Sequence, residues 1–118
     1  MRYVWHIHTD DISQPPDRGA VGTHSINGLL NFPNPEPGDA DRLKRCRDGA
    51  GLEFVLVDGD GQHYYRGRLL AEDETGAAVP LGQMDEEVAF SPLDDFGSPD
   101  SGCSDVLFKS EAGEWEPL

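Results

Sequence analysis

Hydrophobic and polar residues alternate at the start of the chain with the two-residue period of a β-strand. Over residues 2–8, the odd positions carry Tyr3, Trp5 and Ile7, while Val4 and basic or imidazole side chains take the even positions. Aromatic and β-branched residues at this period favour a strand with one side against a core. The sequence therefore predicts a first strand whose aromatic side is buried.

Apolar runs later in the chain are arranged in pairs around turn residues. Leu52–Val57 and Gln62–Leu70 flank Asp-Gly-Asp-Gly, and the runs 105–109 and 114–118 flank Glu-Ala-Gly. Asp-Gly between two apolar runs is a strong signal for a β-hairpin. Each pair is therefore expected to form two antiparallel strands. Further short strands are expected at 77–81 and 86–90.

One segment has the features of a helix. Asp39–Asp48 begins with a residue type that caps helices, ends before Gly49 and carries four bases that favour its C-terminal end. Leu43 and Cys46 are expected to pack it against the sheet. Prolines and glycines predict an irregular loop over 91–104. The expected fold is a single α+β domain of 118 residues: a small, mostly antiparallel β-sheet, curled toward a barrel, with one short helix.

The formal net charge of −14 is concentrated in the second part of the chain. Residues 69–118 contain 13 Asp and Glu and one base, Lys109, whereas residues 1–68 contain 10 acids and 8 bases. A strong field of one sign repels nucleic acid and anionic membrane surfaces and attracts basic partners. Adaptation to a salty cytoplasm or a GC-rich genome explains the same composition, so two interpretations of the charge stay open.

The acidic residues of the second half fall mostly in predicted turns, where they stay hydrated. Held on a rigid sheet, they imitate the charge track of a nucleic-acid backbone and fit a basic groove in a partner. The candidate binding residues are Glu72, Asp73, Glu74, Asp85, Glu86, Glu87, Asp94 and Asp95. In composition the chain resembles phage inhibitors of restriction and CRISPR nucleases. That resemblance implies a basic protein partner that handles nucleic acid.

A second candidate site lies on the first strand. His6, His8 and Asp10 stand two residues apart, so they are expected on one side of that strand. Two imidazoles and a carboxylate suit Zn²⁺ or a related divalent ion. His24 or His63 would complete the set of ligands.

The same residues carry a resemblance to metal-dependent hydrolases. The run His6–Thr9 resembles the first metal-binding motif of the PHP-type phosphoesterases and of the amidohydrolases, and His-x-His-x-Asp resembles the opening of the metallo-β-lactamase motif. The last motif has a His where this chain has Asp11. The alternative interpretation is that His6 and His8 occupy the polar face of an edge strand.

The basic residues fall into two groups. They either form a local positive patch or neutralise nearby carboxylates. Tyr64, Arg66 and Arg68 are expected to share a strand face, which suits a phosphate group or a stacked base. The two groups are Arg42, Lys44, Arg45 and Arg47, followed by Arg66 and Arg68.

Other catalytic and metal motifs are missing or incomplete. The sequence contains no Gly-x-Ser-x-Gly, Gly-x-Gly-x-x-Gly or Walker-type motif. The segment 58–61 begins like an EF-hand loop but lacks the later ligands, so a hairpin turn explains it. Cys46 and Cys103 are too few for a disulfide framework and are expected to be free and unreactive.

Three classes of function follow from these patterns. The first is a small, non-catalytic binding or inhibitor protein that engages a basic protein surface. The second is a small metal-binding protein or metal-dependent hydrolase. The third is an oligomerising structural or accessory protein, because exposed sheet edges pair between chains.

No apolar run has the length of a signal peptide or a membrane span. The protein is expected to be cytoplasmic and to make no contact with a membrane. It is also expected to have no cofactor and to make no direct contact with nucleic acid.

Overall fold

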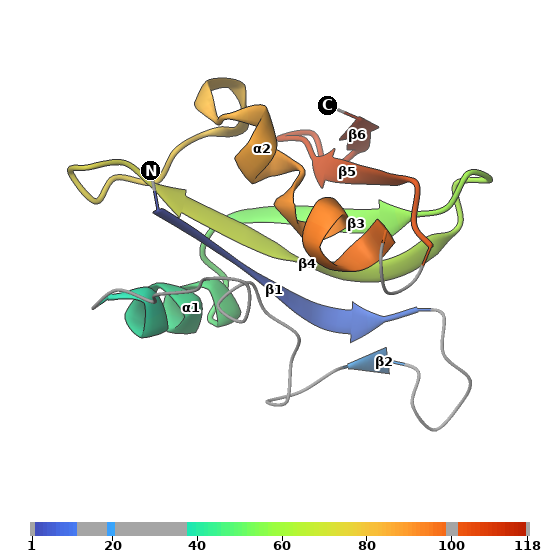
Figure 1. Ribbon diagram of the computed structural model, residues 1–118, viewed down its shortest axis with the longest axis horizontal. Helices are drawn as coiled ribbons and strands as arrows, with labels where there is room; N and C mark the ends of the chain where they lie inside the picture. The colour runs from blue at the N-terminus through green and yellow to red at the C-terminus, as the bar shows by residue number, and fades with distance from the viewer. Residues whose placement is uncertain (1, 12–18, 21–37, 99–101, 118) are drawn as a thin grey trace.

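The predicted strands form an antiparallel sheet at the centre of the molecule (Figure 1). The computed structural model describes residues 2–11, 19–20, 38–98 and 102–117. The strands are β1 (Arg2–Asp10), β2 (Gly19–Ala20), β3 (Leu52–Val57), β4 (His63–Glu72), β5 (Asp105–Lys109) and β6 (Trp115–Pro117). Their order is β2-β1-β4-β3-β5-β6. This confirms the α+β fold with a mostly antiparallel sheet, although the sheet does not close into a barrel because β2 and β6 do not pair.

Both expected hairpins are present. β3 pairs with β4 from Leu52 opposite Leu69 to Val57 opposite His63, and β5 pairs with β6. In the first turn, the Asp58 carboxylate accepts hydrogen bonds from the backbone N–H groups of residues 60 and 62, each at 2.9 Å. Such a side-chain cap stabilises a tight turn. The segment 58–61 is therefore a hairpin turn, as its sequence predicts.

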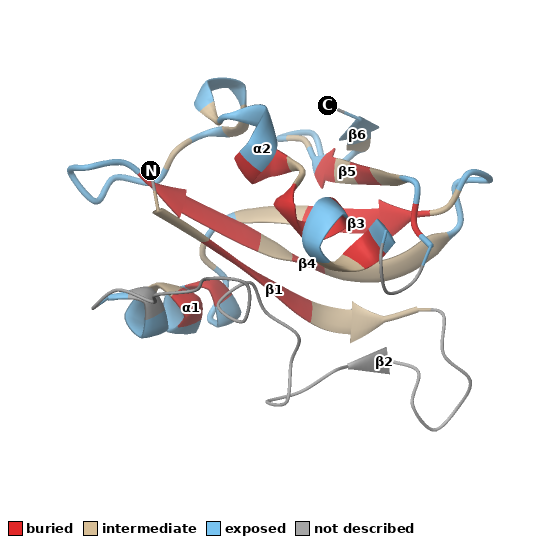
Figure 2. Ribbon diagram, in the orientation of Figure 1, coloured by how far each residue is buried: buried red, intermediate tan, exposed pale blue. Residues whose placement is uncertain are grey.

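One face of the sheet, here called the α2 face, carries the main core. Trp5, Ile7, Phe54 and Leu56 project from it and are fully or almost fully buried (Figure 2). Helix α2 (Glu86–Ala89) and the π-helical turn η4 (Leu93–Gly97) cover this face. They contribute Val88, Ala89 and Leu93 to the core.

The helical cover corrects two expectations. Residues 86–90 are not a strand, and residues 91–98 are helical rather than an irregular loop. Val88, Ala89 and Leu93 recur at the spacing of a helix face, and that face is buried. Pro92 does not break the helical segment, because it lies in the first turn at a φ of −61°, which proline adopts without strain.

The opposite face, here called the α1 face, is covered at one end by helix α1 (Asp39–Arg47). Leu43 and Cys46 of this helix pack against Val4 and Leu70, which confirms the expected packing. The cap differs from the expectation. The helix begins after Gly38, which has a φ of 101°, and no side chain caps it.

Smaller differences concern the segment after β4 and the cysteines. The expected strand at 77–81 is reduced to an isolated bridge between Glu72 and Ala78, followed by the 3-10 turn η3 (Leu81–Gln83). Cys46 and Cys103 are free and buried, as expected. Burial raises the pKa of Cys46 to about 12 and that of Cys103 to about 11, so both thiols stay protonated at neutral pH.

Candidate functional site

The fold sorts charge between the two faces of the sheet. All eight described Lys and Arg residues lie on α1 or at strand positions that alternate onto the α1 face. The segment 73–98, which covers the α2 face, contains seven Asp and Glu and no base. Seven of the 13 carboxylates of residues 69–118 therefore belong to the cover of the α2 face, which contains no base.

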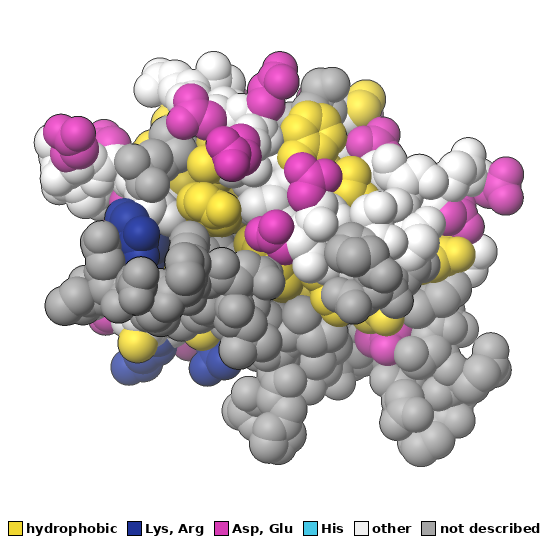
Figure 3. Space-filling model, viewed as in Figure 1, with side chains coloured by type: hydrophobic (Ala, Val, Ile, Leu, Met, Phe, Trp, Pro, Cys, Tyr) yellow, Lys and Arg dark blue, Asp and Glu magenta, His cyan; other side chains and the backbone are white. Residues whose placement is uncertain are grey.

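Seven of the eight predicted binding carboxylates occupy this side, here called the acidic face. Each of these seven residues is exposed. Figure 3 shows acidic side chains spread over the cover of the α2 face, with hydrophobic side chains between them. The acidic face consists of Asp73, Glu74, Asp85, Glu86, Glu87, Asp94 and Asp95.

Glu72 is the exception and corrects the sequence interpretation. Its side chain is buried on the α1 face, where its two oxygens accept hydrogen bonds from Arg42 and Arg45 at 2.6–3.0 Å. These bonds lower the pKa of Glu72 to about 2, with the larger contribution from Arg45. Glu72 therefore ties α1 to the end of β4 and does not belong to the acidic face.

We expect Glu72→Gln to lower the free energy of unfolding at pH 7 by about 2 kcal/mol, because it removes charge-assisted hydrogen bonds. The folded-state pKa lies below the unfolded one, so this stabilisation is present above pH 4.5 and is lost as the pH falls toward 2. Urea unfolding at pH 7 and pH 3 measures both effects. Glu74→Gln, at an exposed position two residues away, is the matched control and should change stability by less than about 0.5 kcal/mol. An equal loss in both variants would contradict the assignment.

The acidic face also contains apolar side chains and crowded carboxylates. Asp95 is exposed as a whole residue, but partial burial of its carboxyl group raises its pKa; the Trp5 indole lowers this pKa, and the nearby charges of Asp94 and Glu87 raise it. These carboxylates repel one another, so a cation placed between them is favoured. The half-buried apolar side chains of this cover are Leu81, Met84, Phe90 and Phe96.

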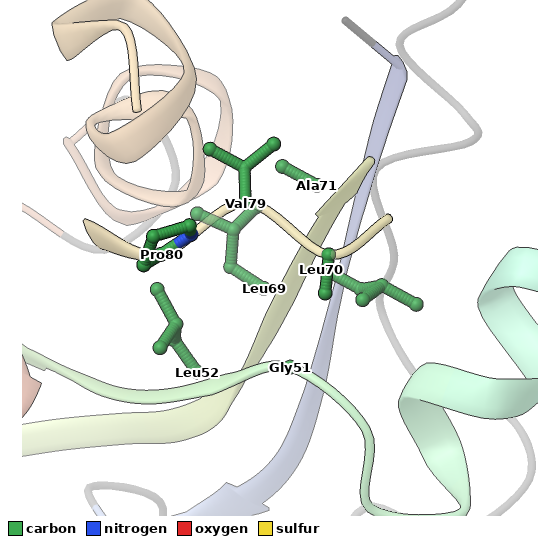
Figure 4. Close-up of a pocket in the computed structure, with 8 residues that line it drawn as sticks. Gly51, Leu52, Leu69, Leu70, Ala71, Val79 and Pro80 are labelled. Atoms are coloured by element: carbon green, nitrogen blue, oxygen red, sulfur yellow. The ribbon is translucent and has the colours of Figure 1, made fainter. Parts of the chain in front are cut away.

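An apolar groove of about 450 Å³ is lined partly by Val79 and Pro80, which lie between Glu74 and Asp85 in the chain. It lies along the end of β4, between the start of β3 and the segment that bridges to Glu72 (Figure 4). In Figure 4, Leu52 lies on one side of the groove and Val79 and Pro80 on the other, with Leu69 between them. Val79 and Pro80 belong to the same basic-residue-free segment as the acidic face, so the groove and the carboxylates form one candidate surface for a partner.

The three residues of the predicted metal site do not gather into a cluster. A β-bulge between Ile7 and Thr9 shifts the pairing of β1 with β4, so that His6 lies opposite Arg68 while Asp10 lies opposite Tyr65. These two partners alternate onto opposite faces of β4. The bulge therefore carries Asp10 to the α2 face, away from His6.

The two imidazoles stay on the α1 face with their ring centroids 6.4 Å apart. Burial lowers the pKa of His6 to about 4, and Arg47 adds to the effect. Within the described ranges, no group of three His, Cys, Asp or Glu side chains is placed to hold a metal ion. His24, an expected further ligand, lies outside the described residues. The alternative interpretation, in which His6 and His8 occupy the polar face of an edge strand, does not account for the burial of His6.

The basic residues pair mainly with carboxylates, as expected if they neutralise nearby acidic side chains rather than form a positive patch. Arg66 binds Asp11 at 2.8 Å, and Arg68 binds Glu53 at 3.2 Å. The pairing of β4 with β3 shifts register between Leu56 and Val57, and Tyr64 lies at this shift. Its side chain packs against the main core. It therefore does not share a face with the two arginines.

A polar cavity on the α1 face was missed from the sequence. Its lining comes from five strands and includes His8, Glu53, Arg66, Lys109 and Trp115. These residues are spread over most of the chain, and no local pattern connects them. Only the strand order brings them together.

No protein-family model, curated protein or solved structure matches this chain. Among the helices that the structure describes, none has the length and apolar character needed to cross a membrane.

Proposed function

We propose that the protein is a non-catalytic binding protein whose acidic face engages a basic surface of another protein. The observation that carries this proposal is the sorting of charge: seven exposed carboxylates and no base over the α2 face, with every described base on the other side. A partner with a surface of clustered Lys and Arg is complementary to this face. A protein that handles nucleic acid has such a surface.

The apolar side chains in the acidic face favour a protein partner over simple hydration. An adaptation to salt explains exposed carboxylates anywhere on the surface, including Asp48, Asp60 and Glu111 outside the acidic face, but it does not call for apolar side chains among them. Here half-buried Phe90 and Phe96 belong to the same cover as the carboxylates, and Val79 and Pro80 of this cover line the apolar groove. Protein interfaces combine such apolar centres with a charged rim.

The proposal predicts a steep dependence of binding on salt. Charged pairs that form across a solvent-exposed interface are screened as the Debye length falls from about 10 Å at 0.1 M to about 3 Å at 1 M salt. We therefore expect the protein to capture a basic partner from its native host at low salt and to release most of it at high salt. Affinity capture at the two ionic strengths, followed by mass spectrometry, measures this.

Two results would contradict the proposal. One is a captured partner whose affinity is the same at low and high salt. The other is a set of captured proteins that is not enriched in basic surfaces relative to capture by an unrelated acidic protein of similar size.

A further inference from the structure

The polar cavity on the α1 face has a separate chemistry from the acidic face. Its volume is about 100 Å³, and it lies between His8 of β1 and Trp115 of β6. Three strands, β4, β3 and β5, separate these two in the sheet. The sheet must therefore curve around this face for both side chains to reach one cavity.

The lining groups offer hydrogen-bond donors rather than acceptors. Arg66 uses Nε and Nη2 on Asp11, so among the described residues its Nη1 has no partner. Lys109 places one contact on Glu53 Oε2 at 3.1 Å and has three N–H groups in all. Each Glu53 oxygen has one ion-pair contact, with Arg68 or with Lys109, and these contacts offset its negative charge at the cavity wall.

His8 and Trp115 complete the walls. His8 Nδ1 lies 2.7 Å from the Thr9 hydroxyl oxygen. In the tautomer in which Nδ1 accepts a hydrogen bond from this hydroxyl, His8 Nε2 carries the ring proton and acts as a donor. The Trp115 ring lies with its centroid 5.7 Å from Lys109 Nζ and 6.1 Å from the His63 ring. The cation–π contact with the Trp115 ring helps to hold the Lys109 ammonium at the cavity wall.

A wider hollow adjoins the cavity and shares Arg66 with it. This hollow has a volume of about 370 Å³ and is lined by Asp11, Gln62, His63 and Arg66. A small ligand can therefore place an anionic group in the cavity and the rest of the molecule in the hollow. Ligand sites commonly combine a few fixed polar groups with such a concave space.

We propose that this cavity binds the oxyanion group, phosphate or carboxylate, of a small molecule. The ion pairs with Asp11 and Glu53 hold Arg66 and Lys109 in place before the ligand arrives. The cavity wall holds two bases, Arg66 and Lys109, and one acid, Glu53, in a chain whose net charge is −14, so the site is a local exception to a field that repels anions. The site lies on the face opposite the acidic one and does not depend on the proposed function.

The test is a titration followed by ¹H–¹⁵N correlation spectra of the full chain. Sodium phosphate and sodium acetate are the two probes, and sodium chloride at equal ionic strength is the reference. We expect phosphate, acetate or both to shift the Trp115 indole N–H and the Arg66 amide saturably, with a Kd on the order of 1 mM. The two arms show which oxyanion the site takes.

Lys109→Gln should weaken this binding at least about tenfold, because Lys109 is part of the cavity wall. Arg66→Gln should do the same if its spectrum shows the native fold. Lys44→Gln, which neutralises an exposed base on α1, is the matched control and should bind like the parent chain. Absence of saturable shifts beyond those in chloride would overturn the proposal. Equal affinities in Lys109→Gln and in the parent chain would also overturn it, since the anion would then bind elsewhere.

Discussion

A variant that carries Asp85→Asn, Glu86→Gln, Glu87→Gln, Asp94→Asn and Asp95→Asn together is expected to lose most of its affinity for the basic partner. These residues form most of the acidic face and are exposed, and a native spectrum of the variant checks the fold because the Asp95 carboxyl group interacts with the indole of the core residue Trp5. A solvent-exposed ion pair contributes about 0.5 kcal/mol, so five of them contribute roughly 2–3 kcal/mol, or roughly 50-fold in Kd. Calorimetry with the captured partner at low salt measures the loss.

The control for this variant has the same change in net charge at other positions. Asp48, Asp60, Glu111, Glu114 and Glu116 are exposed and lie outside the acidic face, so their neutralisation adds the same five charges. The control variant should keep an affinity close to that of the parent chain. If both variants lose affinity equally, net charge rather than the acidic face determines binding. If neither does, the proposed function is wrong.

The strands and the first helix could be predicted because their signals are local. Alternation over residues 2–8 and the Asp-Gly turn after Val57 specify β1 and the central hairpin without help from the rest of the chain. Leu43 and Cys46 likewise identify the buried side of α1. These elements follow from two periods, of about two and 3.6 residues, that the sequence shows directly.

The cover of the α2 face could not be predicted in the same way. Residues 86–98 contain too few apolar positions to separate a short strand from a short helix, and Pro92 favours a break. The sheet beneath decides the outcome, because Val88, Ala89 and Leu93 are buried together only when the segment is helical. Tertiary packing therefore overrides the local signal.

The candidate sites show the same limit. Sequence grouping places Glu72 with Asp73 and Glu74, but strand alternation turns Glu72 alone to the α1 face and its two arginines. The β-bulge in β1 separates Asp10 from His6 although their spacing predicts a shared side. A single unpaired residue in a strand reverses every later side chain, and nothing in the local sequence marks its position.

The second large effect concerns Gly67, which lies opposite the bulge in β1. A Cβ on this residue would lie 2.1 Å from the backbone oxygen of His6 and 2.9 Å from Cζ of Phe54. The oxygen belongs to the paired strand, so it cannot move without opening the β1–β4 pairing. We expect Gly67→Ala to destabilise the fold by more than about 3 kcal/mol and to lower the Tm by roughly 10 °C or more. Thermal unfolding followed by circular dichroism measures this.

Gly82→Ala is the matched control, because it adds the same methyl group where no atom lies within 4 Å and where φ is not in the left-handed region. This variant should be as stable as the parent chain or gain up to about 1 kcal/mol, since alanine reduces the conformational freedom of the unfolded state. A small effect of Gly67→Ala, similar to that of Gly82→Ala, would mean that β1 and β4 do not approach each other this closely. The bulge that separates Asp10 from His6, and the curvature that forms the polar cavity, would then both need revision.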